Sequence, residues 1–188
     1  MEKEYHDNIL RNVPDIYLGT LIDLILVKYK LKLVVHFYSE EYKLIEMIKN
    51  DSDLLLYYLD NQYDDYTDVY AYHIQNIPFV EPLLNELKYV FNNKDYTKKH
   101  YMNIPSRIDG VLYEYPFMAV EKFIGYNELN KKSLAYMELL ILSDYGEISL
   151  TTFVYHKNDY EYCLYHMNQK MLLYQPILSL LGYKIEIK

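Results

Sequence analysis

The sequence predicts one α+β domain spanning residues 1–188, with a mixed or antiparallel sheet and a C-terminal hairpin packed against several helices. A chain of 188 residues, of which 51% are hydrophobic, is long enough to bury one core. Helical and strand patterns alternate along the chain, which favours a mixed fold. No linker or repeat separates two halves, and residues 92–105 are where two subdomains would meet if the chain divided.

The first part of the chain predicts a helix, a strand and a second helix. Pro14 and Asp15 are typical of a first helical turn, because proline needs no amide partner there and the carboxylate meets the positive end of the helix dipole. The apolar residues that follow continue this helix to about Lys28, and the β-rich segment Leu31–Tyr38 predicts a buried strand. Ser39 is a candidate N-cap for a helix that buries Leu44, Ile45 and Ile48.

The next part contains an apolar run, an acidic turn and an alternating segment. The run Leu54–Leu59 fits either a short helix or a strand. The acidic turn covers Asp60–Asp65. The segment Asp68–Ile74 alternates, which predicts a strand with one face formed by Tyr70, Tyr72 and Ile74.

The third part predicts two helices with a pair of strands between them. Pro82 is expected to open the first helix. Two β-rich segments then predict strands at Ile108–Tyr115 and Phe117–Tyr126. Apolar residues at helical spacing predict a helix over Lys131–Ser143, and Gly146 follows it in the position of a C-terminal cap.

The last part predicts the C-terminal hairpin, a helix and a closing strand. Glu147–Tyr155 alternates well, and the polar residues after it are expected to turn the chain into a second strand, Tyr160–Met167. Met171–Leu181 is helical in pattern, with Pro176 breaking or kinking it. Tyr183–Ile187 alternates again and is expected to close the sheet.

The composition points to an AT-rich genome. The chain has 25 Tyr but 6 Phe and no Trp, and only Arg11 and Arg107 are arginines. Tyr, Lys, Asn and Ile have A/T-rich codons, whereas Ala, Gly, Arg, Pro and Trp have G/C-rich ones. We infer a low-GC bacterium, a phage, a virus or a plasmid as the source. This bias explains much of the tyrosine content without any function.

Charge and cysteine content predict a soluble protein of the cytoplasm, or of the host cytoplasm if the source is a virus or phage. The formal net charge of −8 disfavours nonspecific contact with nucleic acid or anionic lipid. Cys163 is the only cysteine, so no intrachain disulfide can form, which fits a reducing compartment. The first residues lack the apolar core of a signal peptide. The apolar run Ile16–Val27 contains Asp23 and is shorter than the roughly 20 residues that span a bilayer.

The stretch Tyr57–His73 concentrates tyrosine and aspartate without any lysine or arginine. Tyrosine offers a large contact area with a polar tip and is favoured in protein interfaces. We therefore expect a binding surface for a protein partner, such as a basic nucleic-acid-binding protein of the host, made of Asp60, Tyr63, Asp64, Asp65, Tyr66, Asp68, Tyr70 and Tyr72. Direct binding of nucleic acid is disfavoured because no cationic groove accompanies the rings.

Metal and nucleotide signatures are weak or missing, so no cofactor is expected. A calcium or magnesium cage in the acidic stretch would lack the ligand order and the turn glycine of an EF-hand. A zinc site would have His156, Cys163 and His166, one ligand short of the usual four. With five glycines in the chain, neither a P-loop nor a dinucleotide-binding loop can be drawn.

One segment, PSRIDGVLYEYPFMAVEKFIG at Pro105–Gly125, carries residues of a candidate active site. It resembles the core of the PD-(D/E)xK nucleases, in which an acid on one strand and an acid-x-lysine on the next converge on Mg²⁺. The resemblance implies Asp109 as the first acid, Glu121 as the second and Lys122 as the lysine that helps to activate water. The sequence departs from the pattern because Glu121 and Lys122 are adjacent, and neighbours on a strand point to opposite faces unless a bulge intervenes.

Together these features favour a non-catalytic accessory or inhibitor protein of a phage, virus or other AT-rich mobile element, acting through an acidic, tyrosine-rich surface. The acidic charge, the tyrosine surplus and the lack of a recognisable catalytic set support this expectation. One alternative is a Mg²⁺-dependent nuclease. Another is a structural subunit of a larger assembly whose alternating strands pair with neighbouring chains. The sequence leaves the oligomeric state open.

Overall fold

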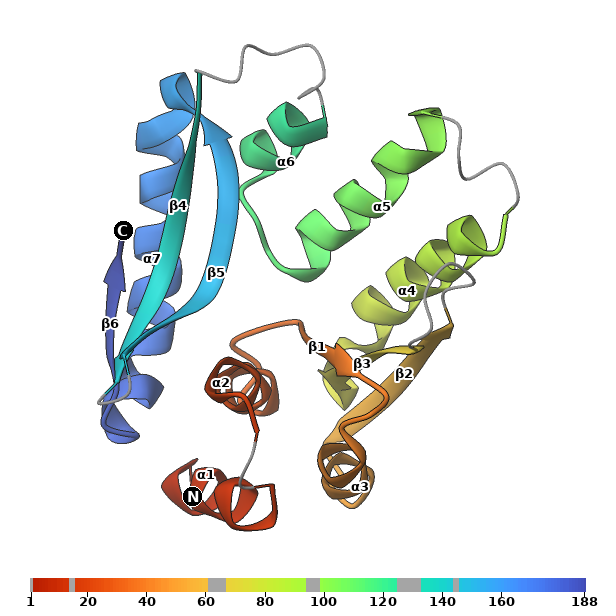
Figure 1. Cartoon of the computed structure of the whole chain (residues 1–188), viewed down its shortest axis with the longest axis vertical. Helices are drawn as coiled ribbons and strands as arrows, with labels where there is room; N and C mark the ends of the chain where they lie inside the picture. The colour runs from red at the N-terminus through yellow and green to blue at the C-terminus, as the bar shows by residue number, and fades with distance from the viewer. Residues whose placement is uncertain (1, 14–15, 61–66, 94–98, 125–132, 144–145) are drawn as a thin grey trace.

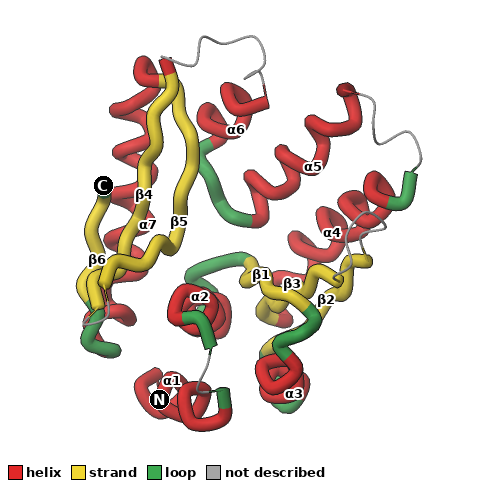
Figure 2. The backbone as a smooth tube through the Cα atoms, viewed as in Figure 1, coloured by secondary structure: helices red, strands yellow, loops and turns green. Residues whose placement is uncertain are grey.

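The structure is a computed structural model that describes residues 2–13, 16–60, 67–93, 99–124, 133–143 and 146–188. It confirms the α+β class: the described residues form seven α-helices and two antiparallel sheets of three strands each. The two sheets stand on either side of helix α2, which spans Leu18–Lys28 (Figures 1 and 2). None of the helices in these ranges is both long and apolar enough to cross a membrane.

The first sheet, sheet A, has the strand order β1-β3-β2. Its strands are β1 (Val34–Tyr38), β2 (Leu54–Asp60) and β3 (Thr67–His73). Helices α1, α3, α4 and α5 belong to the same half of the molecule and span Glu2–Asn12, Tyr42–Lys49, Ile77–Phe91 and Lys99–Leu112. Helices therefore cover both faces of sheet A (Figure 1).

The central strand β3 is buried on both faces. Val69 and Ala71 pack with α2 and α3 in one hydrophobic cluster, whereas Tyr70 and Tyr72 pack with α4 and α5 in another. The side chains alternate as predicted, but the tyrosine face is 5% exposed at Tyr70 and 2% at Tyr72. The prediction that these two rings lie on a binding surface is therefore wrong, because α4 and α5 cover the face to which they belong.

The second sheet, sheet B, has the order β5-β4-β6. Strands β4 (Leu134–Ser143) and β5 (Gly146–His156) form a hairpin, and β6 (Lys184–Ile187) pairs with β4 on the other side. The long helix α7 (Tyr160–Leu180) packs on this sheet, and the short helix α6 (Phe117–Ile124) lies beside β5. Gly146 has a φ of +121°, which a residue with a Cβ rarely adopts, so it suits the turn between β4 and β5.

Helix α2 is apolar on all sides and contributes to both cores. Leu24 and Ile25 pack in the cluster against sheet A, whereas Ile22 and Leu26, one turn apart, pack in the cluster against sheet B. A helix that is hydrophobic all round is stable only when it is enclosed. Burial of α2 therefore holds the two sheets together.

Four predicted elements are wrong in type. The predicted helix Lys131–Ser143 is strand β4 where the structure describes it, so Gly146 caps no helix there. Within the strands predicted at Ile108–Tyr115 and Phe117–Tyr126, residues 108–112 belong to helix α5 and residues 117–124 to helix α6. The strand Tyr160–Met167 is the start of α7, so the C-terminal hairpin is β4–β5 instead. Short apolar runs fit both periods, and contacts distant in the chain decided these four cases.

The other elements agree with the predictions, with shifted boundaries. The helix after Asp15, the strands over Leu31–Tyr38, Asp68–Ile74 and Glu147–Tyr155, and the closing strand are all present. The ambiguous run Leu54–Leu59 is a strand. Two predicted helix starts differ from the structure. Glu41 takes the N-cap position expected for Ser39, and Pro82 lies inside α4 and not at its start. Pro14 and Asp15, expected in a first helical turn, lie outside the described residues.

The close approach of α5 and α6 generates a stability prediction. A Cβ on Gly110 would lie 2.5 Å from Cγ2 of Val120, so Gly110→Ala should cost roughly 1–2 kcal/mol of unfolding free energy despite the better helix propensity of alanine. Urea denaturation measures the change. Adding Val120→Ala should recover part of the loss, because it removes the clashing methyl groups. Val111→Ala, at a half-exposed position of the same helix, is the control, and an equal loss there would contradict the packing argument.

Candidate functional site

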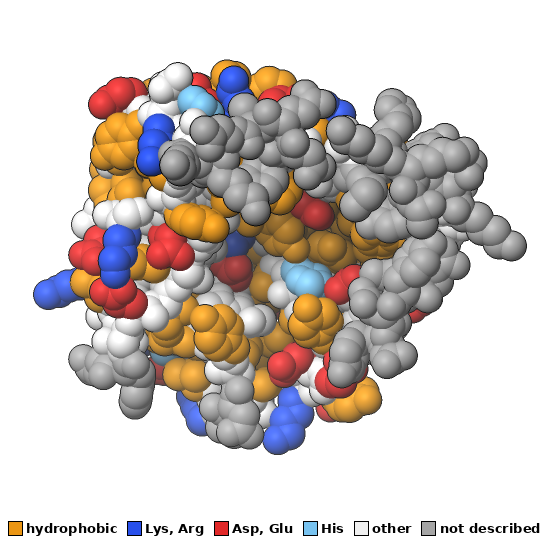
Figure 3. Space-filling view, turned by 45° about the horizontal axis from the view of Figure 1, so that its top comes forward, with side chains coloured by type: hydrophobic (Ala, Val, Ile, Leu, Met, Phe, Trp, Pro, Cys, Tyr) orange, Lys and Arg blue, Asp and Glu red, His pale blue; other side chains and the backbone are white. Residues whose placement is uncertain are grey.

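A pocket of about 320 Å³ lies where the two halves meet, between α5, α6 and the hairpin β4–β5. The space-filling view shows a hollow in the surface, with hydrophobic and acidic side chains around it (Figure 3). The volume is that of a site for a small molecule or a single side chain. Five aromatic rings and one carboxylate are among the lining residues, which are Ser106, Asp109, Tyr113, Tyr115, Ala119, Val120, Phe123, Tyr136, Thr152, Phe153 and Val154.

Helix α5 supplies the polar wall of the pocket. Ser106, Asp109 and Tyr113 stand three and four residues apart, so they lie on one face of the helix. Ile108 and Leu112 form a second face, which packs on sheet A. Packing of the apolar face on sheet A therefore holds α5 in place, and the polar face of the helix lines the pocket.

The turn after α5 holds two of the three tyrosines of the pocket, Tyr113 and Tyr115, in place. Glu114 has a φ of 56°, an uncommon conformation for a residue with a side chain, and three contacts hold the turn. Nε2 of His166 donates to the carbonyl oxygen of Glu114 over 3.0 Å, and Nζ of Lys170 donates to the carbonyl oxygen of Tyr113 over 3.1 Å. The backbone N–H of Leu33 donates to the Glu114 carboxylate over 3.4 Å. Helix α7 thus positions the rings of a pocket that it does not itself line.

Asp109 is the single charged residue among the described lining residues. Burial, and to a lesser extent the negative charge of Asp68, raise the pKa of its carboxyl from 3.8 to about 6. Within the ranges that the structure describes, no hydrogen bond or ion pair joins this carboxylate to another side chain. Among the described residues, the pocket therefore contains a half-buried acid without a compensating cation.

Residues of sheet A lie beneath α5 and contact the environment of Asp109. Oδ1 of Asp68 lies 2.7 Å from Nε2 of His36, and this pair stands on the face of the sheet that α5 covers. On the same face, Tyr70 and Tyr113 share a hydrogen bond between their side chains, and burial raises the pKa of both hydroxyls. Tyr70 therefore does not present its ring to a partner; it anchors a residue of the pocket.

A second group of charges lies deeper, under α7, and is compensated. Nζ of Lys32 lies 2.6 Å from Oδ2 of Asp23, and Lys170 is close to both. Burial lowers the pKa of Lys170 to about 8 and raises the pKa of Asp23 in spite of its two cationic neighbours. Glu114 also lies near Lys170, so the two ammonium groups of this cluster face two carboxylates.

The acidic stretch predicted as a binding surface is only partly described. Tyr63, Asp64, Asp65 and Tyr66 lie outside the described residues. Asp60 is exposed and accepts a hydrogen bond from the hydroxyl of Thr67 over 3.0 Å. Asp68 is engaged by His36, and Tyr70 and Tyr72 are buried. The described members of the set thus form no continuous exposed face.

The residues of the nuclease resemblance are not brought together as that resemblance implies. Asp109 and Glu121 lie on two helices, α5 and α6, in place of two paired strands. Glu121 accepts two hydrogen bonds from the Arg107 guanidinium, at 2.8 and 3.0 Å. Because Arg107 and Asp109 are two residues apart on a helix, they point to different sides, and Asp109 alone faces the pocket. Lys122 follows Glu121 on α6.

The residues considered for zinc have other contacts. Cys163 is buried in the core under α7, and His166 of the same helix bonds to the turn after α5. Both residues belong to helix α7 and not to the predicted strand Tyr160–Met167. Nδ1 of His156 accepts the backbone N–H of Asn158. Among the described residues, no group of three or more His, Cys, Asp or Glu side chains is arranged to hold a metal ion.

The sequence singles out Asp109 as a candidate site residue but not the rings around it. Tyr113, Tyr115 and Phe153 could not be distinguished from the many other aromatic residues of the chain. The helical spacing of Ser106, Asp109 and Tyr113 was the available signal. The prediction of a strand at Ile108–Tyr115 obscures this spacing, because neighbouring residues of a strand point to opposite faces.

The isolated Asp109 carboxylate generates a pH-dependent prediction. Its pKa is higher in the folded protein than in the unfolded chain, so the folded state loses stability as pH rises from about 4 to about 6. Asp109→Asn should leave stability nearly unchanged at pH 4 and raise it by roughly 2–3 kcal/mol at pH 8. Urea denaturation at a series of pH values measures this difference.

Glu121→Gln is the matched control, with the opposite sign. The Arg107 guanidinium lowers the pKa of Glu121, so this carboxylate stabilises the fold above its ordinary pKa and loses that effect as pH falls. The control should therefore be less stable than the native protein at pH 8 and approach it at low pH. If Asp109→Asn behaved in the same way as the control, Asp109 would have a compensating cation after all.

Comparison with known proteins adds no functional information. No protein-family model, no curated protein and no solved structure matches the chain. The features that bear on function are those of the pocket, namely its rings, its volume and its single described carboxylate.

Proposed function

We propose that the protein is a non-catalytic accessory or inhibitor protein that binds a basic partner protein and receives one of its lysine or arginine side chains in the Asp109 pocket. The observation that carries the proposal is a carboxylate without a compensating cation among the described residues of an aromatic pocket. A cation that enters the pocket would supply the missing partner.

The electrostatics of the pocket favour a cation over a neutral or anionic ligand. Asp109 and Asp68 both contribute negative charge, and no lysine or arginine is present among the described lining residues. The faces of aromatic rings are also negative and attract ammonium and guanidinium groups, at roughly 0.5–2 kcal/mol per contact. Tyr113, Tyr115 and Phe153 supply such rings around the carboxylate.

The rim of the pocket favours a protein as the source of that cation. Phe123 and Tyr136, which line the pocket, are 51% and 73% exposed. A free amine that fits a volume of about 320 Å³ would leave most of this apolar rim uncovered. A polypeptide that crosses the opening would cover the rim, and exposed aromatic residues are typical anchors of protein interfaces.

The proposed partner is the basic protein expected from the sequence, but its contact with this chain lies at the Asp109 pocket and not at the acidic stretch. The net charge of −8 would speed the approach of a basic protein. A nucleic-acid-binding protein is the natural class, because its own surface is rich in lysine and arginine. We place the complex in a reducing cytoplasm, where the Cys163 thiol stays reduced.

Capped peptides of nine residues test the proposal directly. The central residue is arginine, lysine or citrulline, the neutral isostere of arginine, between two leucines. Isothermal titration should give an affinity for the charged peptides about tenfold or more above that for the citrulline peptide, because only a cation pairs with Asp109. Asp109→Asn should abolish the difference, and Glu121→Gln should preserve it.

Two further comparisons separate loss of the charge pair from unfolding, and a cation on a polypeptide from a free amine. Loss of binding in Asp109→Asn cannot be ascribed to unfolding, since this variant is expected to be the more stable protein. Arginine amide and spermidine, added as free amines, should bind far more weakly than the peptides because they leave the rim uncovered. Equal affinity for charged and citrulline peptides, or unchanged binding in Asp109→Asn, would refute the proposal.

A further inference from the structure

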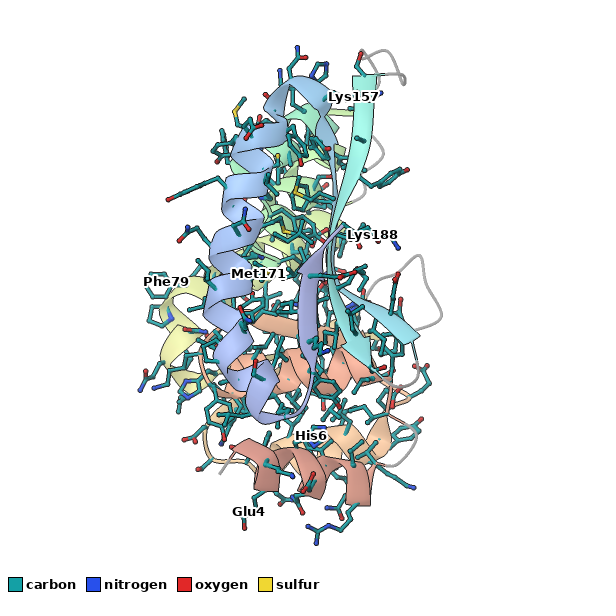
Figure 4. All side chains as sticks on the ribbon, turned by 90° about the vertical axis from the view of Figure 1, so that its left-hand side faces the viewer. Glu4, His6, Phe79, Lys157, Met171 and Lys188 are labelled. Carbon is teal, nitrogen blue, oxygen red and sulfur yellow. The ribbon has the colours of Figure 1, made fainter. Side chains whose placement is uncertain are left out.

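Strand β6 leaves one edge of sheet B open, because it ends the strand order β5-β4-β6. Figure 4 faces this edge: α7 stands on one side of β6, β4 and β5 on the other, and none of the described helices or strands crosses in front. We propose that β6 pairs with β6 of a second copy of the chain, antiparallel about a two-fold axis at Ile185. Two three-stranded sheets would then become one sheet of six strands.

The backbone of β6 directs two residues toward the open edge. Glu138 and Lys188 exchange both of their backbone hydrogen bonds, at 3.0 and 2.9 Å. Such pairs recur at every second residue of an antiparallel ladder, so Lys184 and Glu186 also bond to β4. The N–H and C=O groups of Ile185 and Ile187 therefore point away from β4. Ile185 of a second copy would form a pair of the same kind with Ile185 across the axis.

The charges on β6 are self-complementary in this register. Centring the pair on Ile185 places Lys184 opposite Glu186 of the second copy, and Glu186 opposite Lys184 of the second copy. These positions are the pairs without backbone hydrogen bonds, where side chains approach most closely. Both side chains are exposed, and no salt bridge found in the described ranges uses either of them. Two ion pairs are thus available without breaking an existing one.

Neighbouring registers are less favourable. A shift that centres the pair on Glu186 would place two glutamates opposite each other, and like charges in this position are destabilising. Centring on Ile187 would require Lys188, whose ammonium already donates to the Glu147 carboxylate over 2.8 Å. Charge and hydrogen bonding therefore select the register centred on Ile185.

Helix α7 supplies apolar surface beside the strand. It lies along β6, and Met171 shares a groove with Ile185 and Ile187. The exposed positions of this helix from Tyr162 to Leu180 are all uncharged, although the protein carries a net charge of −8. Leu172 and Leu180 are 61% and 64% exposed. A like-charged copy can approach this side of the molecule without facing acidic side chains on α7.

Charge substitutions on β6 test both the dimer and its register. Sedimentation velocity of the native chain should give twice the mass of one chain at high concentration. Glu186→Lys places two lysines opposite each other and should raise the dissociation constant by about tenfold or more. Lys184→Glu places two glutamates there and should do the same. An equimolar mixture of the two variants should form a mixed dimer, because each lysine again faces a glutamate.

Glu86→Lys on α4 is the matched control, since it makes the same change of net charge at an exposed site and should leave the dimer intact. Circular dichroism checks that every variant is folded. The inference is overturned by a native chain that stays monomeric at every concentration, by single variants that dimerise as the native chain does, or by a mixture that fails to restore the dimer. It does not depend on the proposed function, because β6 contributes no residue to the Asp109 pocket.

Discussion

Enclosure of helix α2 is the constraint on which the rest of the structure depends. Its apolar side chains point in every direction, and a sheet of three strands can cover only one side of such a helix. Two small sheets therefore pack against it from opposite sides. Asp23 is the one acidic residue of this helix, and enclosure of the helix removes its carboxylate from most of the solvent. The buried ammonium of Lys32 forms an ion pair with that carboxylate and so compensates its charge.

The same arrangement creates the pocket. Asp109 comes from the half that contains sheet A and Phe153 from the half that contains sheet B, so the pocket exists only where the halves meet. His166 and Lys170 of α7 reach across this boundary and hold the turn after α5. An acid that has no compensating cation among the described residues carries a cost in stability at Asp109, and natural proteins tolerate such costs where function requires them.

The fold class and the alternating strands were predictable, whereas several elements and most of the pocket were not. Val69 to Tyr72 alternates between aliphatic and aromatic residues, and the two kinds pack in separate clusters on opposite faces of β3. The helices that cover the second face were not predictable from this pattern. In β4, Met137, Leu139 and Ile141 alternate into the core, but neighbouring leucines also fit a helix. In α7, Cys163, Met167 and Lys170 show helical spacing that the surrounding tyrosines obscured. Asp109 was identifiable as an acid, but its environment depends on residues far away in the chain.

The double role of α2 also bears on the order in which the protein folds during synthesis. Leu24 and Ile25 meet β1 and β3 soon after those strands leave the ribosome. Ile22 and Leu26 must wait for Met137 and Tyr174, more than a hundred residues later. Contacts so distant in sequence form slowly, and the apolar surface that awaits them is open to aggregation. When the first half has folded, the apolar surface of α2 that contains Ile22 and Leu26 therefore stays exposed until α7 has been synthesised.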